Sequence, residues 1–337
     1  MKLLEISLPI QVNRTKMLYP LKFTPIMKDR LWGGDKLERL FDKPSVTSTT
    51  GESWELSGVL GDVSIVSNGA LSGTSLNELI VAHGSFLMGA SVIERFGTEF
   101  PILIKFIDAK KDLSIQLHPH DELAKERHNS FGKTEMWYIM DADPGSELIV
   151  GFNKDVSKEE YSTSLEANTL LELLNYEEVV QGDTFFINTG KIHAIGGGVL
   201  LAEIQQTSDI TYRVFDFNRK DKYGNLRELH TEMALDAIDY QKRDDFKVSY
   251  DRTLEEVNAM VDCPYFKTNY LHLTEKMQLK LDQRDSFTIY LCVDGAAEVT
   301  NDWGTTSIHK GETLLVAAAS SKIEIATEGV KLLEVTI

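Results

Sequence analysis

Cysteine is scarce in this chain, and its scarcity excludes one class of protein. The 337 residues include only two cysteines, Cys263 and Cys292. Small secreted proteins that depend on a disulfide framework need several pairs of them. Both cysteines stand in apolar surroundings, VDCPYF and IYLCVDG. We therefore expect two buried free thiols in a reducing compartment.

Long hydrophobic runs are also missing. No stretch approaches the roughly 20 apolar residues that a membrane-spanning helix requires. The N-terminal stretch MKLLEISLPIQVNRTKM is interrupted by Glu5, and its apolar part is too short for the core of a signal peptide. The sequence therefore predicts a cytoplasmic protein, with residues 1–16 as an N-terminal extension that carries no motif.

Basic residues are outnumbered by acidic ones. Lys and Arg number 35 against 52 Asp and Glu, which gives a net charge of -17. A body this acidic repels nucleic acid and anionic membranes, so we expect neither as a partner. A small anionic molecule remains a possible ligand, but it would need a local cluster of Arg or Lys.

Short strands are predicted for most of the chain, and its length favours two domains. Apolar runs between turn residues indicate strands at 61–69, 101–109, 135–142, 147–152, 183–190 and 199–209. Capping patterns and helical spacing predict helices at 75–89, 157–166 and 230–242. An acidic stretch follows the last helix, and we place the domain boundary there. The first domain then covers residues 17–245 and the second residues 246–337.

The second half of the chain repeats features of the first. EMWYIMDADPGSELIV (135–150) is similar to FTIYLCVDGAAEVT (287–300), and both predict a strand, a turn with Asp and Gly, and a strand. VVQGDTFFINTGKIHAI (179–195) is similar to SIHKGETLLVAAASSKIEI (307–325), which has no counterpart of His193. The repeat predicts two related antiparallel β-barrels, of which only the first kept polar chemistry. Common hairpin composition is the alternative explanation.

Potential metal ligands stand at the end of one predicted strand, in KDLSIQLHPHDE (111–122). Strand alternation places Gln116 and His118 on the same face. Pro119 has no N–H for a sheet ladder, so the strand is expected to end there and to leave His120 outside the regular alternation. A histidine beside a strand is more often a surface or hydrogen-bonded residue than a ligand.

Two other strand ends offer further ligand types. Glu135 opens one strand, on the same face as Lys133, and His193 follows another, GDTFFINTG. Histidine nitrogen and carboxylate oxygen suit Zn²⁺, and an amide oxygen suits a divalent ion in a mixed nitrogen and oxygen site. A glutamate beside a lysine is more often an ion pair. The prediction of a metal site therefore rests on the combination of three separate strand ends.

Several long blocks, in the same order, resemble the type I mannose-6-phosphate isomerases (phosphomannose isomerases) in their short bacterial form. These blocks are RLWGG (30–34), GESWELSG (51–58), PILIKFIDAKKDLSIQLHPHDE (101–122), GKTEMWYIM (132–140), GDTFFINTGKIHAIGGG (182–198) and LAEIQQTSDITYRVFDFNR (201–219). The resemblance implies a mainly β fold of the cupin superfamily. We expect two cupin-like antiparallel β-barrel (jelly-roll) domains, with a few helices on the first and no metal site in the second.

The resemblance also implies the metal and its ligands. The family binds one Zn²⁺ per chain, and its ligand motifs fall on Gln116, His118, Glu135 and His193. His120 stands where the family commonly has Asp. We expect His120 to lie outside the metal site.

Further site residues follow from the same blocks. Arg213, in the Thr–Tyr–Arg segment, and Lys133 are the expected catalytic cations. Glu203, Gln205 and Trp32 are expected to bind substrate. The alternative for these residues is structural, with Arg213 forming an ordinary ion pair with a neighbouring aspartate.

The implied activity is the interconversion of mannose 6-phosphate and fructose 6-phosphate through an enediol, with a small sugar phosphate as the partner. Two alternatives stay open: a non-catalytic cupin that binds sugar phosphates, and another metal-dependent cupin enzyme such as an Fe²⁺ oxygenase. The general base is unassigned. The sequence also leaves open whether the protein is a monomer or a homodimer.

Overall fold

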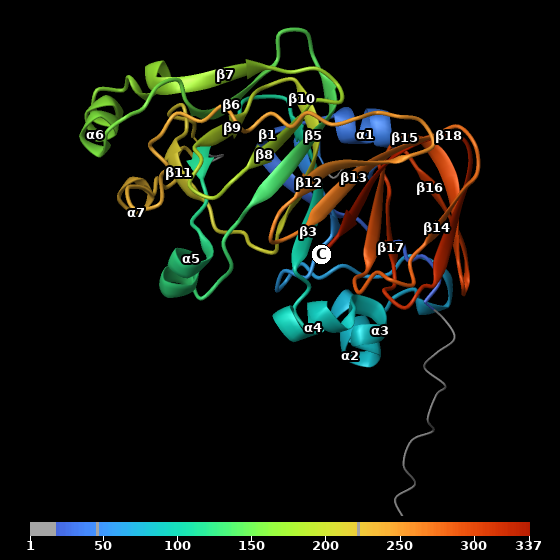
Figure 1. The fold of residues 1–337 in the computed structure, drawn as a ribbon. Coiled ribbons are helices and arrows are strands. Elements are labelled where there is room, and N and C mark those ends of the chain that lie inside the picture. The colour runs from blue at the N-terminus through green and yellow to red at the C-terminus, as the bar shows by residue number, and fades with distance from the viewer. Residues whose placement is uncertain (1–17, 45–46, 221–222) are drawn as a thin grey trace, which may run out of the picture.

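Strands are the main secondary structure of the molecule, and the helices are short and lie at its periphery (Figure 1). The computed structural model describes residues 18–44, 47–220 and 223–337. The extension predicted at residues 1–16 lies outside the described residues. Within the described ranges, no helix is long and apolar enough to cross a membrane.

Two antiparallel sheets pack face to face in the first part of the chain. One sheet has the order β1-β2-β3-β10-β5-β8, and the other has the order β11-β4-β9-β6-β7. The first sheet consists of β1 (Ile26–Gly34), β2 (Thr50–Leu56), β3 (Ile102–Ala109), β5 (Glu135–Ala142), β8 (Thr184–Ile187) and β10 (Val199–Gln206). The second consists of β4 (Ile115–Leu117), β6 (Glu147–Phe152), β7 (Leu174–Glu178), β9 (His193–Ile195) and β11 (Tyr212–Phe215). Apolar side chains of both sheets meet in one core between them.

A third antiparallel sheet, at the right in Figure 1, forms the C-terminal β unit. Its strands are β12 (Val257–Asp262), β13 (Lys267–Leu273), β14 (Met277–Lys280), β15 (Thr288–Asn301), β16 (Gly304–His309), β17 (Thr313–Val316) and β18 (Lys322–Thr336). The two long strands β15 and β18 pair with each other and contain bulges. They enclose a separate apolar core with the other strands of this sheet. The expected mainly β, cupin-like architecture is therefore confirmed.

The helices flank the sheets. They are α1 (Lys36–Phe41), α2 (Leu76–His83), α3 (Ser85–Met88), α4 (Ala90–Phe96), α5 (Asp121–His128), α6 (Lys158–Glu166) and α7 (Thr231–Ala234). Short 3-10 turns occur at Gly69–Leu71 and Leu170–Leu173. The helix predicted at 75–89 is present as α2 and α3. Ser75 and Glu78 form the capping box, and Gly84, with a φ of 51°, divides the two helices.

Three neighbouring strands of the first sheet, β3, β10 and β5, are buried on both faces. Their outer faces, which include Phe106, Tyr138 and Ile204, pack against residues of the C-terminal β unit such as Phe287 and Leu333 in one continuous core. The two β units therefore share a hydrophobic core and do not merely touch.

The inner faces of the same strands change character along their length. In β10, Val199 and Leu201 lie in the core between the two sheets, and the next residues on that face are Glu203 and Gln205. Pairing in register sets Lys105 of β3 opposite Glu203. The polar side chains of neighbouring strands stand in paired positions, so they gather at one end of an otherwise apolar sandwich.

The internal repeat of the sequence corresponds to a repeat of topology. The strand order β8-β5-β10-β3-β2 in the first sheet corresponds to the order β17-β15-β18-β13-β12 in the third, and the chain passes through both sets in the same sequence. The glycines that precede β8 and β17, Gly182 and Gly311, have φ angles of 89° and 83°. Because both turns need a left-handed residue, the Gly–acid–Thr pattern occurs twice.

Three local predictions are wrong. Residues 61–69 form only isolated bridges, through Ile65 and Val66, instead of a strand. The helix predicted at 230–242 ends at Ala234. The N–H groups of Ala237 and Ile238 both donate to the Ala234 carbonyl, and that of Asp239 donates to the Gly190 carbonyl instead of continuing a helix. The second copy of the hairpin, at 287–300, is a single strand that bends at bulges beside Asp294.

Candidate metal centre and adjoining cavity

Three potential ligands meet at the polar end of the sandwich. His118, Glu135 and His193 are buried, and their ligand atoms lie within 4.8 Å of one another. The Nε2 atoms of His118 and His193 are 3.6 Å and 3.5 Å from the two carboxylate oxygens of Glu135. The first sheet supplies Glu135, and the facing sheet supplies His193 and the strand that leads to His118.

Both histidines are oriented by the backbone. The Nδ1 atom of His118 hydrogen-bonds to the carbonyl oxygen of Ile210 at 2.8 Å, and that of His193 to the carbonyl of Lys191 at 2.9 Å. A carbonyl only accepts, so each Nδ1 carries the proton and each Nε2 presents a lone pair. Burial lowers the pKa of His118 well below its usual value and that of His193 to about 4, which keeps both rings neutral.

The Glu135 carboxylate is fully buried, and among the described residues its close cationic contact is the ion pair with Lys133. Lys133 Nζ lies 2.9 Å from Glu135 Oε2 and 3.2 Å from His118 Nε2. Burial and the nearby Glu203 raise the pKa of Glu135, and Lys133 opposes the rise. A buried carboxylate faces the lone pairs of two neutral imidazoles, with the Lys133 ammonium beside them. Such a cluster favours a cation between its members, so this donor set suits a divalent metal ion.

Gln116 lies beside this cluster. It stands opposite His193 in the β4–β9 pairing, and its Nε2 is 3.4 Å from His193 Nε2. Turning the amide by 180° exchanges its nitrogen and oxygen, which places an acceptor toward the other ligands. His120, by contrast, is half-exposed at the N-terminus of α5, where its Nδ1 accepts the N–H of Leu123 and lies 3.0 Å from Glu122.

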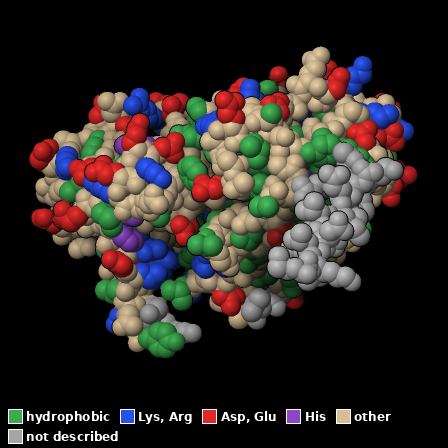
Figure 2. Space-filling view, turned by 90° about the horizontal axis from the view of Figure 1, so that it is seen from below, with side chains coloured by type: hydrophobic (Ala, Val, Ile, Leu, Met, Phe, Trp, Pro, Cys, Tyr) green, Lys and Arg blue, Asp and Glu red, His purple; other side chains and the backbone are tan. Residues whose placement is uncertain are grey.

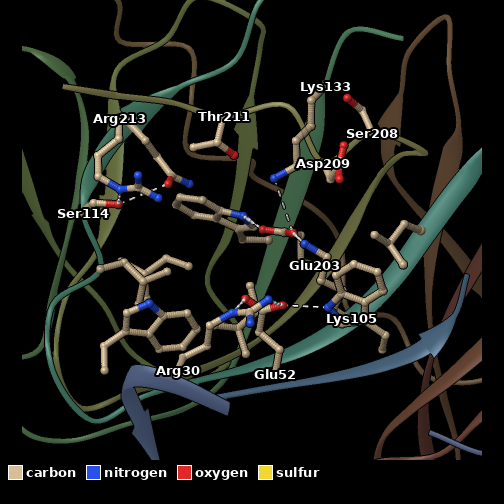
Figure 3. Close-up of a pocket in the computed structure, with 18 of the residues that line it drawn as sticks. Arg30, Glu52, Lys105, Ser114, Lys133, Glu203, Ser208, Asp209, Thr211 and Arg213 are labelled. Atoms are coloured by element: carbon tan, nitrogen blue, oxygen red, sulfur yellow. Dashed lines mark hydrogen bonds and ion pairs between the residues drawn. The ribbon is translucent and has the colours of Figure 1, made fainter. Parts of the chain in front are cut away.

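A cavity of about 350 Å³ adjoins the cluster (Figure 3). Gln116, Trp32, Trp137 and Ser114 are among its lining residues. Its charged lining comprises the basic residues Arg30, Lys105, Lys133, Arg213 and Arg227 and the acidic residues Glu52, Glu203 and Asp209. On the face of the molecule in Figure 2, acidic side chains are scattered widely. The cavity therefore has an excess of positive charge within a chain of net charge -17.

Glu203 lies at the centre of the charged lining. Its Oε1 is 2.8 Å from Lys105 Nζ and 3.8 Å from Lys133 Nζ, and its Oε2 accepts a hydrogen bond from Trp137 at 2.9 Å. Burial would raise the pKa of Glu203, but the two lysines outweigh it and lower that pKa. Glu203 is therefore ionised and balances cations that would otherwise repel one another.

Glu52 is a second carboxylate in the cavity lining. Glu52 forms a two-pronged ion pair with Arg30, at 2.8 Å and 3.1 Å, and accepts the indole N–H of Trp54. Burial opposes its ionisation, but Lys105 and Arg30 lower its pKa. Arg30 and Trp32 alternate along β1, and both line the cavity.

Arg213 points into the cavity, and within the part of the chain that the structure describes it forms no ion pair with Asp209 or Asp216, as the structural alternative would require. Its guanidinium donates to Ser114 Oγ at 3.3 Å (Figure 3). It also donates to the Glu228 carbonyl at 2.9 Å. Asp216 pairs instead with Arg219 and Arg227. Burial and the neighbouring arginines lower the pKa of Arg213.

The sequence-predicted residues separate into two groups. Gln116, Lys133, Glu203, Trp32 and Arg213 all line the cavity. Gln205 does not line it: its amide nitrogen donates to the carbonyl oxygens of Gln206 and Ser208, at 2.8 Å and 2.7 Å, and so holds the turn after β10.

Sequence reasoning missed several lining residues. Arg30, Glu52, Lys105 and Arg227 belong to the cavity. Lys105 had a signal, because a lysine in the middle of the apolar run PILIKFIDA must have a buried partner. Arg227 had none, since it stands in a polar segment after the last matching block, which ends at Arg219.

Comparison with known proteins gives matches along nearly the whole chain. The model of the type I phosphomannose isomerase catalytic domain matches residues 20–154, and that of the mannose-6-phosphate isomerase cupin domain matches residues 255–334. Mannose-6-phosphate isomerase ManA of Bacillus subtilis is 35% identical over 300 residues, which are 88% of this chain and 92% of that protein. The mannose-6-phosphate isomerase of Streptococcus mutans is 34% identical over 302 residues, 89% of this chain and 93% of that one.

Solved structures agree with the sequence matches. A crystal structure of the mannose 6-phosphate isomerase from Bacillus subtilis matches with a TM-score of 0.86 and 30% identity, over 95% of this chain and 100% of that one. A mannosephosphate isomerase structure from Archaeoglobus fulgidus, described as putative, matches with a TM-score of 0.76 and 23% identity, over 95% of this chain and 98% of that one. At that identity the second match concerns the fold alone.

Proposed function

The chain belongs to the family of type I mannose-6-phosphate isomerases, and from this membership we propose that it interconverts mannose 6-phosphate and fructose 6-phosphate through an enediol. We place the reaction in the cavity that adjoins His118, Glu135 and His193. One observation carries the proposal: two backbone-oriented histidines and a buried carboxylate face one another beside a cavity rich in cations.

We propose Gln116, His118, Glu135 and His193 as the ligands of one Zn²⁺. The two imidazole Nε2 atoms and the Glu135 carboxylate match the ligand types that zinc prefers, and the amide of Gln116 supplies an oxygen. When bound, a zinc ion would polarise the substrate's carbonyl group. The carbonyl partners of the Nδ1 atoms fix the ring orientation in advance, as such outer partners do at other metal sites.

The charged lining suits a sugar phosphate. A phosphate brings close to two negative charges at neutral pH, and an acidic protein would repel it everywhere except at a cationic recess. Arg213 presents a planar guanidinium, which can donate two parallel hydrogen bonds to one anion. The tryptophans Trp32 and Trp137 supply flat apolar walls for the faces of a sugar.

Isomerisation moves a proton between C1 and C2, and negative charge develops on the substrate oxygens as it does so. Lys133 and Arg213 face the cavity and can stabilise that charge, more strongly in a dry recess than in water. Glu203 keeps Lys133 charged: burial lowers the pKa of Lys133, but Glu135 and Glu203 outweigh burial and raise it. Glu203 and Trp32 remain proposed substrate-side residues, whereas Gln205 is not proposed to bind substrate, because its side chain holds the turn after β10. The cytoplasmic location remains a prediction.

The proposal is tested by metal analysis together with a coupled assay on mannose 6-phosphate. We expect one zinc per chain and turnover that is lost when a chelator strips the metal and restored when zinc is added back. Zinc or sugar binding without turnover would support the non-catalytic alternative. Bound iron with oxygen consumption would support an oxygenase, and either result would overturn the proposal.

A further inference from the structure

One carboxylate outside the cavity connects the segments that carry the candidate site. Asp121 is the first residue of α5, three residues after His118. Its Oδ1 accepts the backbone N–H of Gly132 at 2.8 Å and the side-chain amide of Gln206 at 3.0 Å. Gly132 directly precedes Lys133. A single side chain therefore joins the ends of β4 and β10 to the start of β5.

The chain of hydrogen bonds continues to Glu135. Gln206 is buried, and its Oε1 accepts the N–H of Thr134 at 2.8 Å, while its own N–H donates to the Thr134 carbonyl at 3.1 Å. Thr134 stands between Lys133 and Glu135 in the sequence. The direction in which those two side chains enter the site is thus set by Gln206, and Gln206 is held in turn by Asp121.

The other oxygen of Asp121 reaches the C-terminal β unit. Tyr265, in the turn between β12 and β13, donates its hydroxyl to Asp121 Oδ2 at 2.7 Å. Arg95 of α4 secures that turn, because it donates to the Pro264 carbonyl and lies 5.8 Å from the Tyr265 ring centroid. The C-terminal unit thus has a polar contact with the metal-bearing segments, besides the shared apolar core.

Asp121 and Gly132 are packed too closely for a larger residue at position 132. A Cβ atom added to Gly132 would lie 2.8 Å from the backbone nitrogen of Asp121 and 2.9 Å from Asp121 Oδ1. Such distances are too short for real atoms, so only glycine lets the two segments approach this closely. The carboxylate therefore meets Gly132 in one fixed arrangement.

We propose that Asp121 is a positioning residue, through which Tyr265 of the C-terminal β unit fixes Lys133 and Glu135 in the metal site. This inference rests on the proposed function. It assigns the C-terminal unit a part in the reaction, although within the described residues its sheet contributes no side chain to the cavity lining. Groups that orient metal ligands from behind typically change metal affinity or activity about ten- to a hundredfold when removed.

The test uses the full-length protein loaded with Co²⁺, whose visible absorption reports the ligand geometry. Asp121→Ala removes every contact of the carboxylate. Asp121→Asn keeps an oxygen for Gly132 and Gln206 while its amide can donate to Tyr265. We expect the Ala variant to have an altered spectrum and to release metal to a chelator about ten- to a hundredfold faster. Its kcat should fall by a larger factor than its KM changes. The Asn variant should recover most of the loss.

A matched control separates positioning from stability. Tyr265→Phe and Tyr250→Phe each delete one hydroxyl, and the Tyr250 hydroxyl donates at 2.7 Å to the Gly182 carbonyl, away from the metal segments. We expect the Tyr265 variant to shift the spectrum and metal release in the direction of Asp121→Ala, and the Tyr250 variant to change only the melting temperature. If Asp121→Ala does not fold, Tyr265→Phe decides the question by the same readouts.

The outcome that overturns the inference is distinct from failure of the proposed function. A wild-type protein that binds no metal and does not turn over mannose 6-phosphate removes the premise. A wild-type protein that does both, together with Asp121 and Tyr265 variants that keep its spectrum, metal-release rate and kcat, overturns the positioning role alone.

Discussion

Gln116 and His193 stand opposite each other in the β4–β9 pairing, with their Nε2 atoms 3.4 Å apart. The two residues are 77 positions apart in the sequence, and only the sheet register brings them together. A shift of that register by one residue would turn one of the two side chains away from Glu135. The candidate metal site therefore depends on strand pairing as much as on the identity of its ligands.

Replacing a proposed ligand should remove both metal and activity. We expect His193→Ala to lose bound zinc and at least about a thousandfold in kcat/KM, because a bound metal contributes several kcal/mol to stabilising the transition state. Metal content by mass spectrometry and the coupled assay measure the two effects. His120→Ala is the matched control, since that half-exposed histidine caps α5 outside the cluster and should leave both unchanged. A zinc-free but fully active His193 variant would refute the assignment.

The contribution of Arg213 to catalysis should depend on the shape of its side chain as well as on its charge. Arg213→Lys keeps a positive charge but loses the fork that donates to Ser114 Oγ and the Glu228 carbonyl. We expect kcat/KM for mannose 6-phosphate to fall about thirtyfold, which corresponds to a charged hydrogen bond of about 2 kcal/mol. Steady-state kinetics measure the change. Arg39→Lys, on the exposed surface of α1, is the control, and equal kinetics for the two variants would contradict the prediction.

The shared core should couple the stability of the two β units. Phe287 is fully buried and stacks on Phe100, with ring centroids 4.9 Å apart. We expect Phe287→Ala to lower the free energy of unfolding by about 3–5 kcal/mol, as deletion of a buried aromatic ring typically does. Urea titration measures it. Val81→Ala, at an exposed position of α2, should change stability by no more than about 0.5 kcal/mol. A small effect of Phe287→Ala would argue that the two units fold independently.

Stability in acid should depend on Asp216. Burial opposes ionisation of Asp216, but Arg227 and Arg219 outweigh burial and lower its pKa. The unfolded-state pKa is then the higher of the two, so the stabilisation is complete above about pH 4 and is lost as the pH falls through the folded-state value. Between pH 6 and pH 2 we expect the wild type to lose about 1 kcal/mol more than Asp216→Asn does, since the two arginines are partly exposed and solvent screens their charge. Urea titrations of both proteins across this range measure it, and parallel pH curves would contradict the prediction.

Much of the fold could be predicted from local signals. Strands β3, β5, β6, β8 and β10 were expected from apolar runs, and the paired topology of the two β units from the repeated Gly–acid–Thr pattern. The segment 230–242 could not be predicted in this way, because tertiary hydrogen bonds to Gly190 and Val156 override its helical spacing. Propensity is a weak guide where the backbone has partners elsewhere.

In the candidate site, too, some residues could be identified from the sequence and others could not. Residues within long motifs, such as His118 and Glu135, could be named from the sequence because the motifs mark strand ends. Arg227 could not, since it stands outside those motifs, and Arg30 carries no ligand pattern of its own within RLWGG; both reach the cavity only after the chain has folded. The Asp121–Tyr265 contact spans 144 positions, and neither residue carries a signal of its own.

The core shared by the two β units limits how this chain can be divided. A fragment that stopped before β12 would expose one face of β3, β5 and β10 to solvent, including Phe106, Tyr138 and Ile204. Such a surface promotes aggregation. The C-terminal unit is thus an obligatory partner of the catalytic one. Neither half can serve as an interchangeable module in a fusion protein, and an evolving lineage could discard the second half only by rebuilding that face.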